Sequence, residues 1–177
     1  MTVLVTYATK HGATRGIAER IAEVLADSDL AVEILPVSEA GDVSRYDAVV
    51  AGSAVYMGSW MKEATAFLRR NAETLATRPV WLFSSGPVAT TEVGSREDQL
   101  REAVSAKQLA ELGDLVTARD HHVFFGAVDR GTFGLGERLL ASLPAGRKLL
   151  PEGDFRDWPD IEAWAGQIAV ALAAVPA

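Results

Sequence analysis

Residues 5–18 read VTYATKHGATRGIA. An apolar strand here runs into a short polar loop with one glycine and two threonines, and a helix follows directly. Free backbone N–H groups and the positive end of the helix dipole meet at such a junction, which suits it to hold an anion, most often a phosphate. Gly12 would let the backbone approach the anion, and the hydroxyls of Thr9 and Thr14 would add donors on either side. An ordinary strand-to-helix turn with a threonine cap is the structural alternative.

This loop lacks the two common nucleotide-binding patterns. It fits neither G-x-x-x-x-G-K-[ST] nor G-x-G-x-x-G, so neither a nucleoside triphosphate nor a dinucleotide is predicted. The Mg²⁺ and pyrophosphate chemistry of those two families is therefore not expected.

Composition predicts a single soluble domain over residues 1–177, since 49% of the residues are hydrophobic and 23% are charged. The chain has no cysteine, which excludes disulfides, thiolate catalysis and sulfur-ligated metals. The first residues, MTVLVTY, lack the pattern of a secretory signal, and no apolar run approaches the ~20 residues of a membrane-spanning helix. We therefore expect a cytoplasmic protein. A net charge of -7 argues against a general nucleic-acid binder.

Apolar runs alternate with segments of helical spacing along the whole chain. The predicted strands cover residues 2–7, 30–37, 47–54, 78–85 and 121–128. Predicted helices include one from about Glu97 to Leu112 and a last one after Trp158-Pro159 that Asp160 would cap. This alternation predicts a doubly wound α/β fold, with a five-stranded parallel sheet and helices on both faces.

A long segment at about residues 129–157, here named the insertion, separates the fifth predicted strand from the last helix. It is rich in glycine and proline, and loops of this length are often functional. Within it, the cations Arg130, Arg138, Arg147 and Lys148 stand against Glu137 alone. We expect this basic stretch to meet an anionic partner or a membrane surface, with a merely solvated surface as the alternative.

The opening stretch resembles the flavodoxin signature. Tyr7, Thr9, Gly12, Thr14 and Ala18 occupy the positions of that signature, whereas Thr6 stands where the family prefers an apolar or aromatic residue. The resemblance extends through the strand–helix alternation and implies a flavodoxin-like fold with strand order 2-1-3-4-5. It also implies an FMN cofactor at the switch point beside the first strand, with its phosphate on residues 9–14.

The resemblance further implies that the loops after the third and fourth strands hold the flavin ring. In the former loop, Tyr56 and Met57 are the better ring contacts, and Trp60 is more simply a core residue. The loop at residues 84–95 has no aromatic residue, so one face of the flavin would be open. The expected cofactor-binding residues are Thr9, Lys10, His11, Gly12, Ala13, Thr14, Ala54, Val55, Tyr56, Met57, Gly58, Ser85, Gly86, Pro87 and Val88.

No catalytic residue is predicted, because the flavin itself would carry the redox chemistry. No metal site is predicted either. His121 and His122 are adjacent on a strand, so their side chains point to opposite faces of the sheet.

Within this fold the chain looks most like the bacterial quinone-dependent protoporphyrinogen dehydrogenase family. The similar length, the long basic insertion and the GAV that closes the fifth strand carry this likeness. It implies an FMN-dependent oxidoreductase of heme biosynthesis, with a porphyrinogen substrate and a quinone acceptor at the membrane. Arg130, Arg138, Arg147 and Lys148 would then contact substrate carboxylates or anionic lipid.

Two other functions fit the same sequence. A flavodoxin-type electron carrier without its own substrate would use the acidic body of the protein to meet a basic redox partner. A binding module that has lost FMN is the other, and the intact Thr9, Gly12 and Thr14 argue against it.

Overall fold

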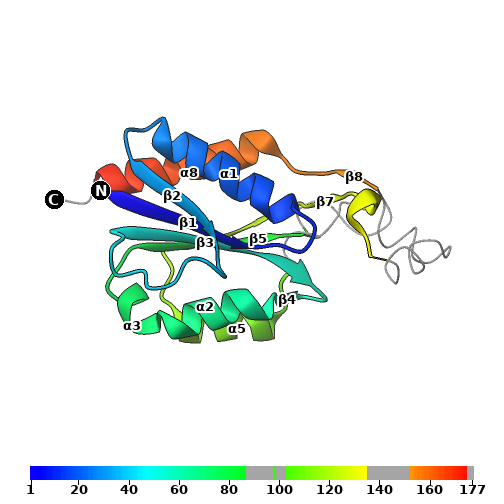
Figure 1. Ribbon diagram of the computed structural model, residues 1–177, viewed down its shortest axis with the longest axis horizontal. Helices are drawn as coiled ribbons and strands as arrows, with labels where there is room; N and C mark the ends of the chain where they lie inside the picture. Colours follow the sequence, from blue (N-terminus) through cyan, green and yellow to red (C-terminus); the bar gives the residue numbers. More distant parts are fainter. Residues whose placement is uncertain (87–97, 99–102, 135–151, 175–177) are drawn as a thin grey trace.

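A parallel sheet lies between two layers of helices in the computed structural model, which describes residues 1–86, 98, 103–134 and 152–174 (Figure 1). The sheet contains β1 (Thr2–Ala8), β2 (Ala31–Pro36), β3 (Ala48–Tyr56), β5 (Val80–Ser85) and β6 (Asp120–Phe124). These strands are parallel and follow the order β2-β1-β3-β5-β6, which confirms the predicted fold and strand order. A short sixth strand, β4 (Ser59–Trp60), pairs antiparallel with the end of β3.

The two faces of the sheet carry separate hydrophobic cores. α1 (Ala13–Ala26) and α8 (Trp158–Ala173) cover one face, and α2 (Lys62–Arg70), α3 (Ala72–Leu75) and α5 (Ala106–Leu115) cover the other (Figure 1). Alternate strand residues serve alternate faces, so Val3 and Val5 pack with α1 and α8, while Leu4 packs with α2. This double burial explains why β1, β3 and β5 read as nearly continuous apolar runs.

The predicted strand at residues 121–128 was wrong in its second half. β6 ends at Phe124, and residues 127–128 form a separate strand, β7 (Ala127–Val128). β7 pairs antiparallel with β8 (Gly153–Asp154), so the insertion is closed near its base by a two-stranded ladder. The chain leaves the main sheet at Gly126, which lies against Gly86: a Cβ at Gly126 would lie 3.5 Å from the Gly86 nitrogen.

Two helix boundaries also differ from the prediction. α5 begins at Ala106, where the Ser105 hydroxyl caps it by accepting the Gln108 N–H at 3.2 Å. In α8 the cap is Asp157, which accepts the Asp160 N–H at 3.3 Å, and Asp160 lies in the first turn. Proline stands in that first turn, where its missing N–H costs nothing. No helix in the described parts of the chain is long and apolar enough to span a bilayer.

Candidate functional site

The carboxyl ends of β1, β3 and β5 bring the three predicted binding segments to one edge of the sheet (Figure 1). Ala8 pairs with Ser53 and Ala54 pairs with Ser85, so the carboxyl ends of the three strands lie side by side. In the sheet, β2 lies on one side of β1 and β3 lies on the other, so the strand order reverses at β1. Open α/β sheets form a ligand crevice at such a reversal. Pro87 and Val88, two of the predicted contacts, lie outside the described residues.

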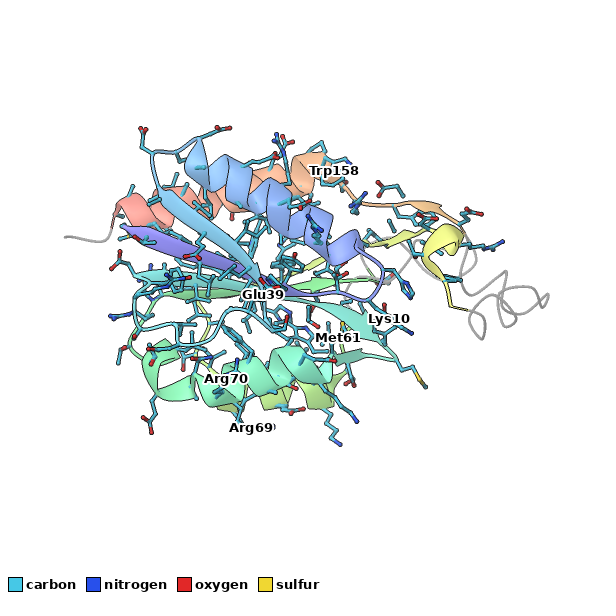
Figure 2. All side chains as sticks on the ribbon, viewed as in Figure 1. Lys10, Glu39, Met61, Arg69, Arg70 and Trp158 are labelled. Atoms are coloured by element: carbon cyan, nitrogen blue, oxygen red, sulfur yellow. The ribbon has the colours of Figure 1, made fainter. Side chains whose placement is uncertain are left out.

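Residues 9–14, here named the phosphate loop, form a tight turn into α1. Gly12 is the N-cap residue and has φ 85°, a left-handed conformation that favours glycine. The Thr9 hydroxyl accepts the Gly12 N–H at 3.0 Å and so fixes the turn. Figure 2 shows Lys10 on this loop, at the end of the sheet that also carries β4. The first N–H groups of α1 have no partner within the helix and are therefore available to an anion.

Thr14 gives this loop its most specific signal. Its side chain lies in the first turn of α1 and is 1% exposed. Its Oγ1 is buried and has no hydrogen-bond partner among the described residues. A buried hydroxyl without a partner costs about 1–3 kcal/mol, and an anion at this helix N-terminus would remove that cost. The residues present therefore fit the phosphate of the expected cofactor.

The β3–β4 turn, residues 56–59, supplies the candidate wall for a flat ring. Met57 and Gly58 have φ 51° and 75°, the conformation of a two-residue hairpin turn, and Tyr56 pairs with Ser59 across it. Tyr56 is 44% exposed and Met57 is fully exposed, so both present apolar surface to solvent at the carboxyl end of β3. Ala54 and Val55 lie just before them on β3 and are more buried.

Trp60 belongs to the core, as the sequence suggested. It is 5% exposed and packs in the core with residues of α2. The structure places it in β4. Its indole N–H donates to the Ser84 hydroxyl at 2.7 Å.

Residues of the insertion touch the phosphate loop on both sides of Gly12. Thr132 lies at the end of the 3-10 turn η1 (Arg130–Thr132), and its Oγ1 lies 3.2 Å from His11 Nδ1. The ring of Phe133 lies 5.2 Å from the His11 ring. On the other side, Arg156 Nη1 donates to the Ala13 carbonyl at 3.4 Å.

Sequence reasoning missed Thr132 and Arg156 as neighbours of this site. One signal was available: Gly16 stands inside α1, where a glycine is normally unfavourable. A Cβ at Gly16 would lie 2.5 Å from Arg156 Nη1, so the glycine makes room for the arginine. Of the predicted basic contacts, Arg130 lies in η1, whereas Arg138, Arg147 and Lys148 lie outside the described residues.

The two adjacent histidines do point to opposite faces of β6. His121 Nε2 lies 2.8 Å from Ser84 Oγ on the α5 side, and burial lowers the pKa of His121. His122 Nε2 lies 3.1 Å from Asp160 Oδ2 at the start of α8. Each histidine therefore joins β6 to a different neighbour.

Comparisons with known proteins agree with this architecture. Residues 4–145 match the sequence model of the flavodoxin domain. No curated protein matches the chain. Oxidised flavodoxin 1 from Bacillus cereus superposes with a TM-score of 0.60 at 12% identity, over 99% of this chain and 100% of that one. Flavodoxin 2 from the same organism gives a TM-score of 0.56 at 22% identity, over 98% of each chain.

A larger redox enzyme contains the same fold. Rubredoxin oxygen:oxidoreductase from Desulfovibrio gigas matches with a TM-score of 0.60 at 16% identity, over 98% of this chain but 36% of that one. At such identities these structures show a shared fold only. The sequence model, however, spans most of the chain, and the chain therefore belongs to the flavodoxin domain family.

Proposed function

We propose that this protein binds FMN at the carboxyl ends of β1, β3 and β5 and acts as a flavin-dependent oxidoreductase. The observation that carries the proposal is the buried Thr14 hydroxyl, which has no partner among the described residues and lies in the first turn of α1. Membership of the flavodoxin family supports the same cofactor. When bound, FMN would supply the redox chemistry, and the protein would supply binding and orientation.

The phosphate loop would bind the FMN phosphate. The N–H groups in the first turn of α1 and the Thr14 hydroxyl would donate to it, and the helix dipole would favour its charge. The Thr9 hydroxyl accepts from Gly12 and thereby keeps the loop in the shape that exposes these donors. Lys10 and His11 flank the site and add positive charge or donors.

The ring of FMN would lie between the β3–β4 turn and the end of β5. Tyr56 and Met57 offer exposed apolar surface to one face of it. Gly58 allows a tight turn, and Ala54 and Val55 would line the floor. Ser85 and Gly86 would contact the polar edge from β5, and Pro87 and Val88 remain predicted contacts beyond the described residues.

A two-electron oxidoreductase is favoured by the insertion. Its residues Thr132, Phe133 and Arg156 pack against the phosphate loop, so the insertion begins and ends next to the proposed cofactor. Arg130 lies in η1, the same short turn as Thr132, and could pair with a substrate carboxylate. A porphyrinogen with carboxylate side chains, with a quinone as the electron acceptor, is therefore the first substrate class to assay.

An electron carrier without its own substrate is the second candidate. The exposed Tyr56 and Met57 beside the proposed ring, together with the net charge of -7, suit docking of a basic redox partner. Stepwise reduction of the FMN-loaded protein without oxygen separates the two candidates. Two electrons entering at one potential favour the oxidoreductase, and two well-separated one-electron potentials favour the carrier.

Thr14→Glu tests the proposed phosphate site. A carboxylate at this position would meet the FMN phosphate, and contact between like charges costs several kcal/mol, so FMN affinity should fall at least about a hundredfold. Fluorescence titration of the apoprotein with FMN measures this affinity. Lys62→Glu, which adds an acidic residue at the start of α2 instead, should leave it unchanged. Wild-type affinity in Thr14→Glu would rule out the phosphate site.

A further inference from the structure

Three polar side chains on β4, β5 and β6 form a hydrogen-bonded chain, in which Trp60 and Ser84 are buried and His121 is partly buried. Trp60 Nε1 on β4 donates to Ser84 Oγ on β5 at 2.7 Å, and Ser84 Oγ lies 2.8 Å from His121 Nε2 on β6. Ser84 is 0% exposed and Trp60 is 5% exposed. The His121 ring also lies edge-on to the Trp60 ring, with 6.0 Å between centroids.

Counting donors and acceptors shows which atom donates each proton along this hydrogen-bonded chain. The indole N–H of Trp60 is only a donor, so Ser84 Oγ must accept there. Within the described residues, the other side-chain partner of Ser84 Oγ is His121 Nε2. The hydroxyl proton of Ser84 is therefore donated to Nε2, which requires neutral His121 with its proton on Nδ1. A protonated His121 would turn its own N–H toward the hydroxyl and leave the buried Ser84 proton without an acceptor.

Trp60 is the end of the chain that reaches the proposed flavin site. It pairs with Val55 across the β3–β4 hairpin and follows directly on Met57, Gly58 and Ser59. Its backbone N–H donates to the buried Gln108 Oε1 at 3.0 Å. The Gly58 carbonyl at the tip accepts the Ser105 N–H at 2.9 Å. The backbone of the turn is thus tied to α5, and the Trp60 side chain ties it to the sheet.

We propose that the chain His121–Ser84–Trp60 is the element that positions the β3–β4 turn, and through it the flavin ring. The second half of this statement rests on the proposed function. Trp60, Ser84 and His121 are positioning residues here, because they lie behind the turn and would act through Tyr56 and Met57. This hydrogen-bonded chain also connects an edge strand of the sheet to the site, because His121 lies on β6.

The surroundings of His121 keep it neutral. Burial lowers the pKa of His121, and the nearby His122 lowers it as well, while Asp120 opposes both. A cavity of about 310 Å³ opens beside His121. Its walls from α5 and the following segment carry no charge, and they comprise Leu109, Leu112, Gly113, Val116, Thr117 and Ala118. From β5 the neighbours are Leu82 and Ser84, which are also uncharged.

Hydrogen exchange in the apoprotein tests the positioning role without any cofactor. Trp60→Phe removes one N–H from the chain, and Ser84→Ala removes its centre. Loss of a buried hydrogen bond should speed exchange of the Trp60 and Met61 amides about five- to tenfold. Trp164→Phe is the matched control, because it removes an indole N–H that donates to Asp120 Oδ2 at 2.6 Å on the opposite face. Exchange in the turn should be unaffected by that control.

FMN affinity and midpoint potential test the second half of the proposal. We expect Trp60→Phe and Ser84→Ala to weaken FMN binding about five- to tenfold and to shift the potential, whereas Trp164→Phe keeps wild-type values. A merely structural role would lower the stability of all three variants and leave the potential alone.

The two measurements separate the possible failures. Unchanged exchange in the turn of both Trp60→Phe and Ser84→Ala would overturn the proposal, and so would faster exchange with wild-type affinity and potential. If wild-type protein binds no FMN, the proposed function fails, while the exchange rates still decide whether the chain positions the turn.

Discussion

At the scale of single residues, two threonine hydroxyls are buried in the same way, but only one of them is expected to bind a ligand. Thr6 Oγ1 in β1 and Thr14 Oγ1 in α1 are both buried, and neither has a hydrogen-bond partner among the residues described. Thr6 is 0% exposed and lies between Leu4 and Ala8 on the face of β1 that packs toward α2. Thr14 lies at a helix N-terminus, where a ligand could satisfy it.

Replacing each threonine by valine separates the two cases. Thr6→Val removes a costly buried polar atom at nearly constant volume and should raise the free energy of unfolding by about 1 kcal/mol. FMN affinity should stay unchanged. Thr14→Val should stabilise the apoprotein similarly but weaken FMN binding about tenfold, since a hydrogen bond to a charged group is lost. Urea unfolding and FMN titration measure both effects, and equal FMN affinities in the two variants would contradict this assignment.

Gly16 is a second residue whose type follows from a distant contact. An interior Gly→Ala change normally stabilises a helix by about 1 kcal/mol. At Gly16 the new Cβ would displace Arg156, which contacts the Ala13 carbonyl and stacks 4.5 Å above the Trp158 ring. We therefore expect Gly16→Ala to gain almost nothing in the free energy of unfolding.

Gly166→Ala provides the comparison for this prediction. Gly166 lies inside α8, and a Cβ there meets no heavy atom within 4 Å. This variant should gain about 1 kcal/mol in the same urea experiment. Equal gains in the free energy of unfolding at both positions would show that Arg156 moves aside at no cost and that its contacts with α1 do not stabilise the fold.

At the scale of elements, the sequence predicted what local patterns encode. Apolar runs identified all five parallel strands. The runs of β1, β3 and β5 are nearly continuous because these strands are buried on both faces. The end of the fifth strand was missed, since Phe125 continues the apolar run and only Gly126 marks the exit. The start of α8 shifted because the capping carboxylate is Asp157, one residue before Trp158.

Contacts between distant elements were beyond local patterns. Three segments of the candidate site were named in advance, because each follows a strand that the alternation predicts. The pairing of Trp60 with Ser84 and His121 depends on the register of β5 and β6, which periodicity does not give. Arg156 was missed for the same reason, since it meets α1 across 143 positions of sequence.

At the scale of the whole molecule, acid should weaken the fold in two separate ranges. The pKa of His121 is lowered from the ordinary 6.5, so the unfolded chain takes up a proton more readily than the folded protein. The contribution of neutral His121 to the free energy of unfolding is complete above pH 6.5. It is lost as the pH falls from 6.5 through the lower pKa of the folded state. The pKa values of Asp42 and Asp154 are lowered from 3.8, so their contributions are lost only in stronger acid.

His121→Asn tests the upper range. Unfolding in urea at pH 7, 6 and 5 should show wild-type stability falling with pH, with a flatter profile in the variant. Below pH 4 both proteins should lose stability together, because both keep Asp42 and Asp154. A variant whose profile matches wild type between pH 7 and 5 would show that His121 does not titrate differently on folding.

The ladder between β7 and β8 has a consequence for how such a chain diversifies. Val128 and Gly153 are paired, so the two ends of the segment between them meet at one point of the fold. A different segment inserted between these two residues would not change the register of any parallel strand. Among the residues described, Thr132 and Phe133 contact His11 of the phosphate loop, so such a replacement would remove these two contacts. Replacing this segment would therefore change the surroundings of the phosphate loop and leave the parallel sheet as it is.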